Sequence, residues 1–219
     1  MFTLLLHDLR YYLSNLKEAA YLYIYFLSMS ALFVFGFSAE GSRDYAAAIL
    51  WVTLISALLL ASPLLFQRDE EEGRLDYLRL LPISLELVVV ARYLACYLVF
   101  VLPILALVPP AGLLLQIPPS VWGQVVAVLA LGGALVLAVI VMASAMMTGL
   151  SHHSGLIGLM VLPLLIPLVI FGVSALDAII SGAVAAEGSQ LLLLSALAFF
   201  LLPLALLVSA SCLRVTGDS

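Results

Sequence analysis

The residue types that most often carry chemistry are few in this sequence, and its histidines illustrate the point. His152 and His153 are adjacent, and neighbouring side chains on a helix point about 100° apart. They therefore cannot supply both faces of one haem iron. We interpret the pair as part of a solvated turn, and we predict no metal site and no haem ligand in this chain.

The sequence contains none of the common catalytic motifs. Cys96 and Cys212 both lie inside apolar runs without a CxxC motif, so we interpret them as small hydrophobic side chains rather than a disulfide or metal pair. HExxH, a GxSG nucleophile turn and the GxxxxGK[ST] phosphate-binding loop are also absent from the sequence. We therefore expect a protein that is not an enzyme, and any ATP must be bound by another chain.

The elements that would position a functional residue are apolar. Of the 219 residues, 65% are hydrophobic and only 10% are charged, whereas soluble domains average about 45–50% and 25%. This composition excludes soluble enzymes, disordered proteins and small disulfide-stabilised modules. A net charge of −5 offers no basic surface for nucleic acid, which we exclude as a partner. The expected solvent is the lipid bilayer.

Six apolar stretches are long enough to cross a bilayer, because a hydrocarbon core of about 30 Å needs roughly 20 helical residues. An even number of spans places both termini on one side, which then carries every Lys and Arg except Arg43. This asymmetry predicts cytoplasmic termini. We expect an all-α membrane protein in which residues 1–219 form one transmembrane domain, with spans near 19–37, 46–66, 88–109, 121–148, 156–176 and 190–212.

Residues 1–18 have the pattern of an amphipathic helix that lies in the membrane interface before the first span. Several leucines and Tyr12 share one arc of a helical wheel, and His7 and Asp8 lie on the polar arc. We expect His7 to be solvated. Asp8 and Glu18 also argue against a cleaved signal peptide, whose leading region is basic.

One long predicted cytoplasmic loop, residues 67–87, holds nine charged residues. The simplest interpretation is a solvated loop that keeps the ends of two helices in water. After Gly73, however, leucines recur at helical spacing until Pro82 ends the helix, which favours a short amphipathic helix docked in a partner protein. Ser84 is then expected to cap the third span, with Glu86 in its first turn.

Several segments resemble a known class of permeases. The predicted cytoplasmic loop resembles the coupling loop of ABC-2-type permeases. It contains an acidic run, then Glu-Gly, and then a leucine-rich turn that ends in Leu-Pro. The resemblance is closer to the CcmB family, the permease subunits of the cytochrome c maturation (haem exporter) ABC transporter, and it covers essentially the whole chain. The most specific part is the Leu-Pro and Ile-Pro run followed by an Asp. The matching segments are 65–69 (LFQRD), 73–82 (GRLDYLRLLP), 161–171 (VLPLLIPLVIF) and 175–178 (ALDA).

This resemblance implies a type V exporter-like permease in a bacterial inner membrane, which forms a homodimer and docks a separate, CcmA-like ATPase subunit. It also implies CcmC-like and CcmD-like haem-handling subunits and a CcmE-like haem chaperone as partners. No cofactor would be bound by this chain itself. The residues implied to receive the motion of the ATPase are Glu70, Glu71, Glu72, Gly73, Arg74, Leu75, Leu78, Leu81 and Pro82.

The function implied is coupling of the partner's ATP hydrolysis to haem delivery, or to release of the haem-loaded chaperone, on the external side. The alternative is an ABC-2-type permease that exports a different hydrophobic or lipid-like substrate. In either case the sequence predicts a transporter subunit without catalytic residues of its own.

Prolines indicate where spans bend. The fifth predicted span contains Pro163 and Pro167, each of which removes a backbone donor and favours a kink. Broken helices often move or line cavities in transporters, and a static kink that improves packing is the alternative. Single prolines such as Pro103 receive no role.

Two further features of the later spans invite an interpretation. Asp177 lies near the external end of the fifth span, so a functional role on the external side competes with a simple interfacial location. The resemblance to ABC-2-type permeases implies a short re-entrant or surface helix on the external side at residues 178–190, and the composition alone also permits an ordinary loop. Small residues around Gly132 and Gly133 in the fourth span predict close helix contact, in a dimer or with a partner subunit.

Overall fold

The computed structural model describes residues 2–14, 16–37, 39–66, 84–147, 154–182 and 184–215. Every regular element within these ranges is helical, which confirms the all-α prediction. The α-helices are α1 (Phe2–Ser14), α2 (Leu16–Gly36), α3 (Ala39–Asp44), α4 (Ala46–Leu60), α7 (Leu85–Cys96), α8 (Leu102–Ala106), α9 (Val108–Leu114), α10 (Trp122–Met146), α11 (Ser154–Ser181) and α12 (Val184–Val215). Short helical turns of other types are η1 (Ser62–Leu64), η2 (Tyr97–Val101) and η3 (Pro119–Val121).

Five helical stretches in the described residues are long and apolar enough to cross a bilayer. Another apolar helix, α4, has 15 residues, and at about 1.5 Å per residue it is shorter than a core of roughly 30 Å. The multi-pass architecture is supported, while the count of six spans stays a prediction. The five stretches are Ala19–Gly36, Leu85–Leu114, Pro119–Met146, Val161–Ser181 and Gln190–Arg214.

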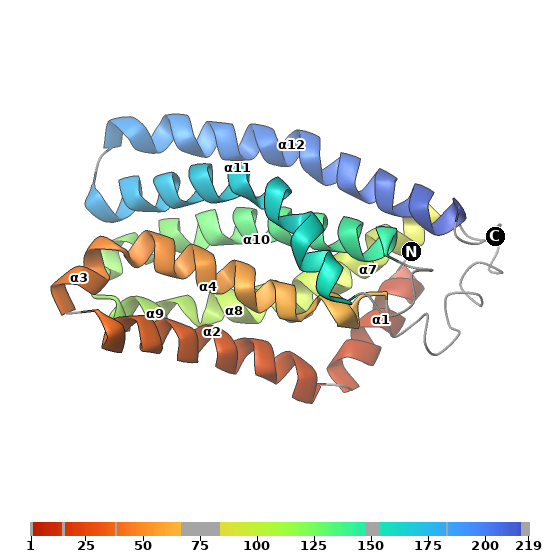
Figure 1. Cartoon of the computed structure of the whole chain (residues 1–219), viewed down its shortest axis with the longest axis horizontal. Helices are drawn as coiled ribbons and strands as arrows, with labels where there is room; N and C mark the ends of the chain where they lie inside the picture. The colour runs from red at the N-terminus through yellow and green to blue at the C-terminus, as the bar shows by residue number, and fades with distance from the viewer. Residues whose placement is uncertain are drawn as a thin grey trace.

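Helix α10 lies at the centre of the bundle, with α11 and α12 on one side and α4 on the other (Figure 1). Its glycines allow close approach. A Cβ added at Gly132 would lie 2.0 Å from the ring of Trp51 on α4, and one at Gly133 would lie 2.8 Å from Val101. Gly172 on α11 approaches the same indole, with a corresponding distance of 2.2 Å. These glycines pack within the chain, rather than against a second protomer or partner subunit as predicted.

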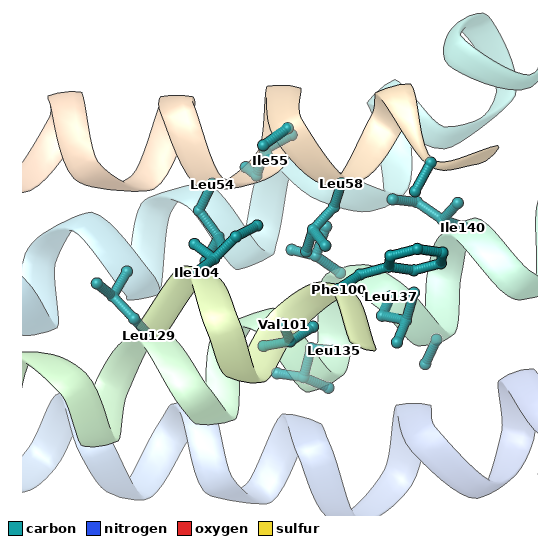
Figure 2. Close-up of a cluster of buried hydrophobic side chains, with 14 of the residues drawn as sticks. Leu54, Ile55, Leu58, Phe100, Val101, Ile104, Leu129, Leu135, Leu137 and Ile140 are labelled. Atoms are coloured by element: carbon teal, nitrogen blue, oxygen red, sulfur yellow. The ribbon is translucent and has the colours of Figure 1, made fainter. Parts of the chain in front are cut away.

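The apolar core lies where α4, the third span and α10 meet (Figure 2). All three elements contribute side chains that are almost fully buried, so burial of apolar surface fixes the relative positions of these elements. Figure 2 labels Leu54, Ile55 and Leu58 from α4, Phe100, Val101 and Ile104 from the third span, and Leu129, Leu135, Leu137 and Ile140 from α10.

The third span is divided into α7, a π-helical turn over Tyr97–Val101, α8 and α9. Pro103 lacks the N–H that an α-helix would donate to the carbonyl of Val99. The hydroxyl of Tyr23 on α2 donates to that carbonyl instead. Since π-helical turns are rare and mark an altered hydrogen-bond ladder, Pro103 has a structural consequence that the sequence-based prediction does not assign to it.

The fifth span behaves differently. Helix α11 continues from Ser154 to Ser181 with Pro163 and Pro167 inside it, and both proline side chains are exposed. Figure 1 shows the N-terminal part of α11 inclined to the rest of the helix. The inclination agrees with a proline kink, and whether this kink moves stays a prediction.

Candidate functional site

The segment that carries the predicted ATPase-coupling residues, Glu70 to Pro82, lies outside the described residues. The structure shows the chain on both sides of it, which we call the loop base: Leu65 and Phe66 before the segment, and residues 84–92 after it. In Figure 1 the start of α7 lies at the same end of the bundle as α1 and the last turns of α12. The loop base is therefore close to two elements that are distant in sequence, α1 and α12.

Helix α7 begins at Leu85, so the last residues of the predicted loop belong to the helix. Ser84 is the N-cap residue, but its side chain makes no capping hydrogen bond. Its carbonyl accepts hydrogen bonds from the N–H groups of Leu87 at 3.0 Å and Val88 at 3.3 Å. The predicted side-chain cap is therefore wrong, whereas the position of Glu86 in the first turn is confirmed.

Arg92, two turns into α7, is the central polar residue of the loop base. Only 2% of its surface is exposed. Its Nη1 donates a hydrogen bond to the carbonyl of Leu65 at 2.9 Å, and its Nε lies 3.6 Å from Oδ2 of Asp8. The guanidinium carbon lies 5.1 Å from the centroid of the Phe66 ring. One side chain therefore joins the helix after the loop to the residues before it and to α1.

Helix α1 turns Asp8 toward the bundle. Asp8 is only 9% exposed, because its counter-charge Arg92 lies inside the bundle. The prediction that Asp8 lies on a solvated face of α1 is therefore wrong. His7, by contrast, is solvent-exposed as expected, with Nδ1 3.7 Å from Asp8. Tyr12 is buried with its ring centroid 5.4 Å from that of Phe100, and burial raises the pKa of the Tyr12 hydroxyl well above its ordinary value of 10.0.

Among the residues that the structure describes, two ion pairs hold α7, and they differ in exposure. A buried guanidinium must be paired and hydrogen-bonded, since an isolated buried charge is strongly unfavourable. Arg92 is ion-paired with Asp8 and hydrogen-bonded through Nη1 to the Leu65 carbonyl, although its Nε makes no hydrogen bond to these described residues. At the start of α7, Glu86 Oε1 lies 2.5 Å from Nη2 of Arg214 on α12, but the two side chains are 38% and 57% exposed. Such an exposed pair contributes about 0–1 kcal/mol to stability.

Asp177 lies at the other end of α11 from Ser154, one turn before the helix ends, and its side chain is exposed. The residues that follow it form no separate helix in the part of the chain that the structure describes. α11 ends at Ser181 and α12 begins at Val184. Gly182 takes a φ of +75°, a conformation that favours glycine and permits a tight turn. The predicted short external helix is therefore wrong.

No metal cluster is found in the described ranges. No group of three or more His, Cys, Asp or Glu side chains gathers there in a metal-binding arrangement, and His152 and His153 lie outside those ranges. A groove of about 190 Å³ between α2 and α4 is apolar, lined by Phe33, Phe37, Tyr45, Ala48, Ile49 and Val52.

Sequence reasoning missed Arg92 and Asp8 as site residues. The sequence-based prediction used Arg92 only as one of the positive charges that indicate the topology. It used Asp8 only as evidence against a cleaved signal peptide. A signal was present, because Arg92 lies inside the predicted span 88–109, and an ionisable residue within a span is a functional candidate by default. Its partner was not readable, since Asp8 belongs to a distant segment.

Comparison with known proteins gives a consistent result over nearly the whole chain. The family model described as "CcmB protein" matches residues 1–216. "Heme exporter protein B" of Paracoccus denitrificans is 36% identical over 194 residues, 87% of this chain and 88% of the relative. The protein of the same name from Haemophilus influenzae is 32% identical over 89% of the length of this chain and 88% of its own length. The protein of this name from Pseudomonas aeruginosa is 31% identical over 94% of the length of this chain and 94% of its own length.

Proposed function

The chain belongs to the CcmB protein family, and from this premise we propose that it is the permease subunit of an ABC transporter in cytochrome c maturation. Its relatives are named heme exporter protein B, so haem is the proposed cargo of the complex. The subunit would sit in a bacterial inner membrane with both termini in the cytoplasm. The family membership, together with the helical bundle, is the observation that carries this proposal.

A separate, CcmA-like ATPase subunit would supply the energy, because this sequence holds no phosphate-binding loop. We propose that it docks on residues 70–82, from Glu70 to Pro82. Their leucine stripe would fill a groove on the partner, and their carboxylates would set its orientation and its rate of association. The buried attachment of the loop base through Arg92 supports this role, because movement received by the loop then reaches the bundle directly.

The remaining parts of the proposal concern the complex. A homodimer would provide two docking loops, and CcmC-like and CcmD-like subunits with a CcmE-like chaperone would handle haem. ATP hydrolysis would drive haem delivery, or release of the loaded chaperone, on the external side. Asp177, exposed at the end of α11 opposite the loop base, would face that side, and Pro163 and Pro167 would allow α11 to flex.

The docking loop has a direct test. Replacing Leu75, Leu78 and Leu81 together with Asp should abolish co-purification of the ATPase subunit in mild detergent, because three charges cannot enter an apolar groove. Membrane insertion should be unchanged. Leu87→Asp is the control, since this leucine is already 41% exposed at the start of α7. Unchanged co-purification of the triple variant would remove the docking proposal.

A further inference from the structure

We propose that Arg92 is a positioning residue for energy coupling: it joins both flanks of the loop and α1 into one mechanical unit. This inference rests on the function proposed above, because it assumes that the loop receives the motion of an ATPase. It adds a residue and a helix, α1, that the docking loop alone does not include.

The geometry of the guanidinium carries the argument. Arg92 belongs to α7, the helix that follows the loop, and its Nη1 holds the carbonyl of Leu65 at 2.9 Å, just before the loop. Its Nε lies 3.6 Å from the Asp8 carboxylate on α1. One nitrogen of this planar group thus donates a hydrogen bond to the chain before the loop, while its charge pairs with α1 through Nε, which makes no hydrogen bond within the described part of the chain. A lysine ammonium is a single point charge and lacks this extended planar shape.

Helix α1 is attached to the same unit by more than charge. Tyr12, one turn beyond Asp8, is 6% exposed and packs edge-on against Phe100 in the π-helical turn. The contacts of α1 with α7 are among the most extensive in the molecule. A displacement of α7 must therefore carry α1 with it, or break a buried ion pair and an aromatic contact together.

Packing alone does not require an arginine at this position. The guanidinium lies over the ring of Phe66, and Val89 and Cys96 are three residues before and four residues after Arg92 on the same helix. All three are apolar or nearly so and almost fully buried, so an aliphatic side chain would be compatible with them. Buried ion pairs are often no more stabilising than apolar replacements, and their best-attested use is to fix one specific arrangement. The arrangement fixed here is that of α1, Leu65 after η1, and α7.

The test uses the complete transporter and two variants, the single variant Arg92→Gln and the double variant Asp8→Asn/Arg92→Gln. Only the double variant leaves no buried charge unpaired. Both variants should retain the ATPase subunit and hydrolyse ATP at a rate within about twofold of wild type. The yield of cytochrome c with covalently bound haem should fall about tenfold in both, a typical coupling effect. Arg92→Lys should give an intermediate yield, and Arg214→Gln, which removes only the exposed pair, should match wild type.

The double variant separates positioning from folding. Its amount in the membrane and its thermal midpoint should return toward wild type, because the uncompensated charge is gone, while the yield of cytochrome c stays low. A wild-type yield from the double variant would overturn the proposal and leave Arg92 with a structural role only. A different result, in which the wild-type chain retains no ATPase subunit, would contradict the proposed function and, with it, this inference.

Discussion

The third and fifth spans both contain prolines inside long apolar helices, yet only the third leaves the α-helical register. Pro103 lies in α8, directly after the π-helical turn η2 in the core. Pro103 has no N–H to donate to the carbonyl of Val99, and the hydroxyl of Tyr23 on α2 donates to this carbonyl instead. Pro163 and Pro167 lie on the exposed side of α11, and the helix continues through them. The number of prolines therefore does not predict where a span changes its hydrogen bonding.

The difference lies in the neighbours of each span. In the third span Arg92 and Val99 are held by side-chain contacts with α1 and α2. In the fifth span the close contact is steric, between Gly172 and Trp51. We infer that the third span is held by directional contacts able to transmit motion, and that the fifth is held by shape. The predictions below separate these two kinds of attachment.

The largest effect is expected when the buried charge pair of the third span is broken. Arg92→Gln leaves Asp8 buried without its counter-charge, and this type of change costs about 3–5 kcal/mol of unfolding free energy. Arg214→Gln removes the exposed pair with Glu86 and should cost no more than about 1 kcal/mol. Unfolding in mixed micelles, followed by circular dichroism, measures both. Equal losses would show that the burial of Arg92 has no special consequence.

An intermediate effect is expected in the fifth span when its shape is changed. Gly172→Ala places a Cβ 2.2 Å from the indole of Trp51, and overpacking of this kind costs about 1–3 kcal/mol. Pro167→Ala is the matched change on the exposed side of the same helix and should not lower the free energy of unfolding. If Gly172→Ala is as stable as wild type, the close contact between α4 and α11 is not a constraint on the bundle.

The smallest effect is expected for the hydrogen bond beside Pro103. Tyr23→Phe removes the donor to the Val99 carbonyl and should cost about 1 kcal/mol. In a Pro103→Ala background the same change should cost less, because an alanine at this position supplies its own N–H to that carbonyl. A double-mutant cycle measures this difference. Independent effects of the two substitutions would contradict the hydrogen-bond exchange inferred for the third span.

The helical class, the multi-pass character and the family were readable from the sequence, because long apolar runs and short motifs are local signals. The positions of Arg92 and Asp8 were not, since their contact joins distant segments and depends on which face α1 turns to the bundle. The role of Pro103 depended in the same way on Tyr23 from another helix. The glycines at positions 132 and 133 were recognised as contact points, but the partner, a tryptophan of the same chain for Gly132, was not.

The central claim is that this chain is driven by a separate ATPase. It is tested most directly by purifying the full-length protein from its native membrane in mild detergent and identifying its partners by mass spectrometry. The account predicts an ATPase subunit present in amounts comparable to the chain itself, and its loss on replacement of Leu75, Leu78 and Leu81 by Asp. Cytochrome c assembly that depends on this chain but proceeds without any associated ATPase would contradict it.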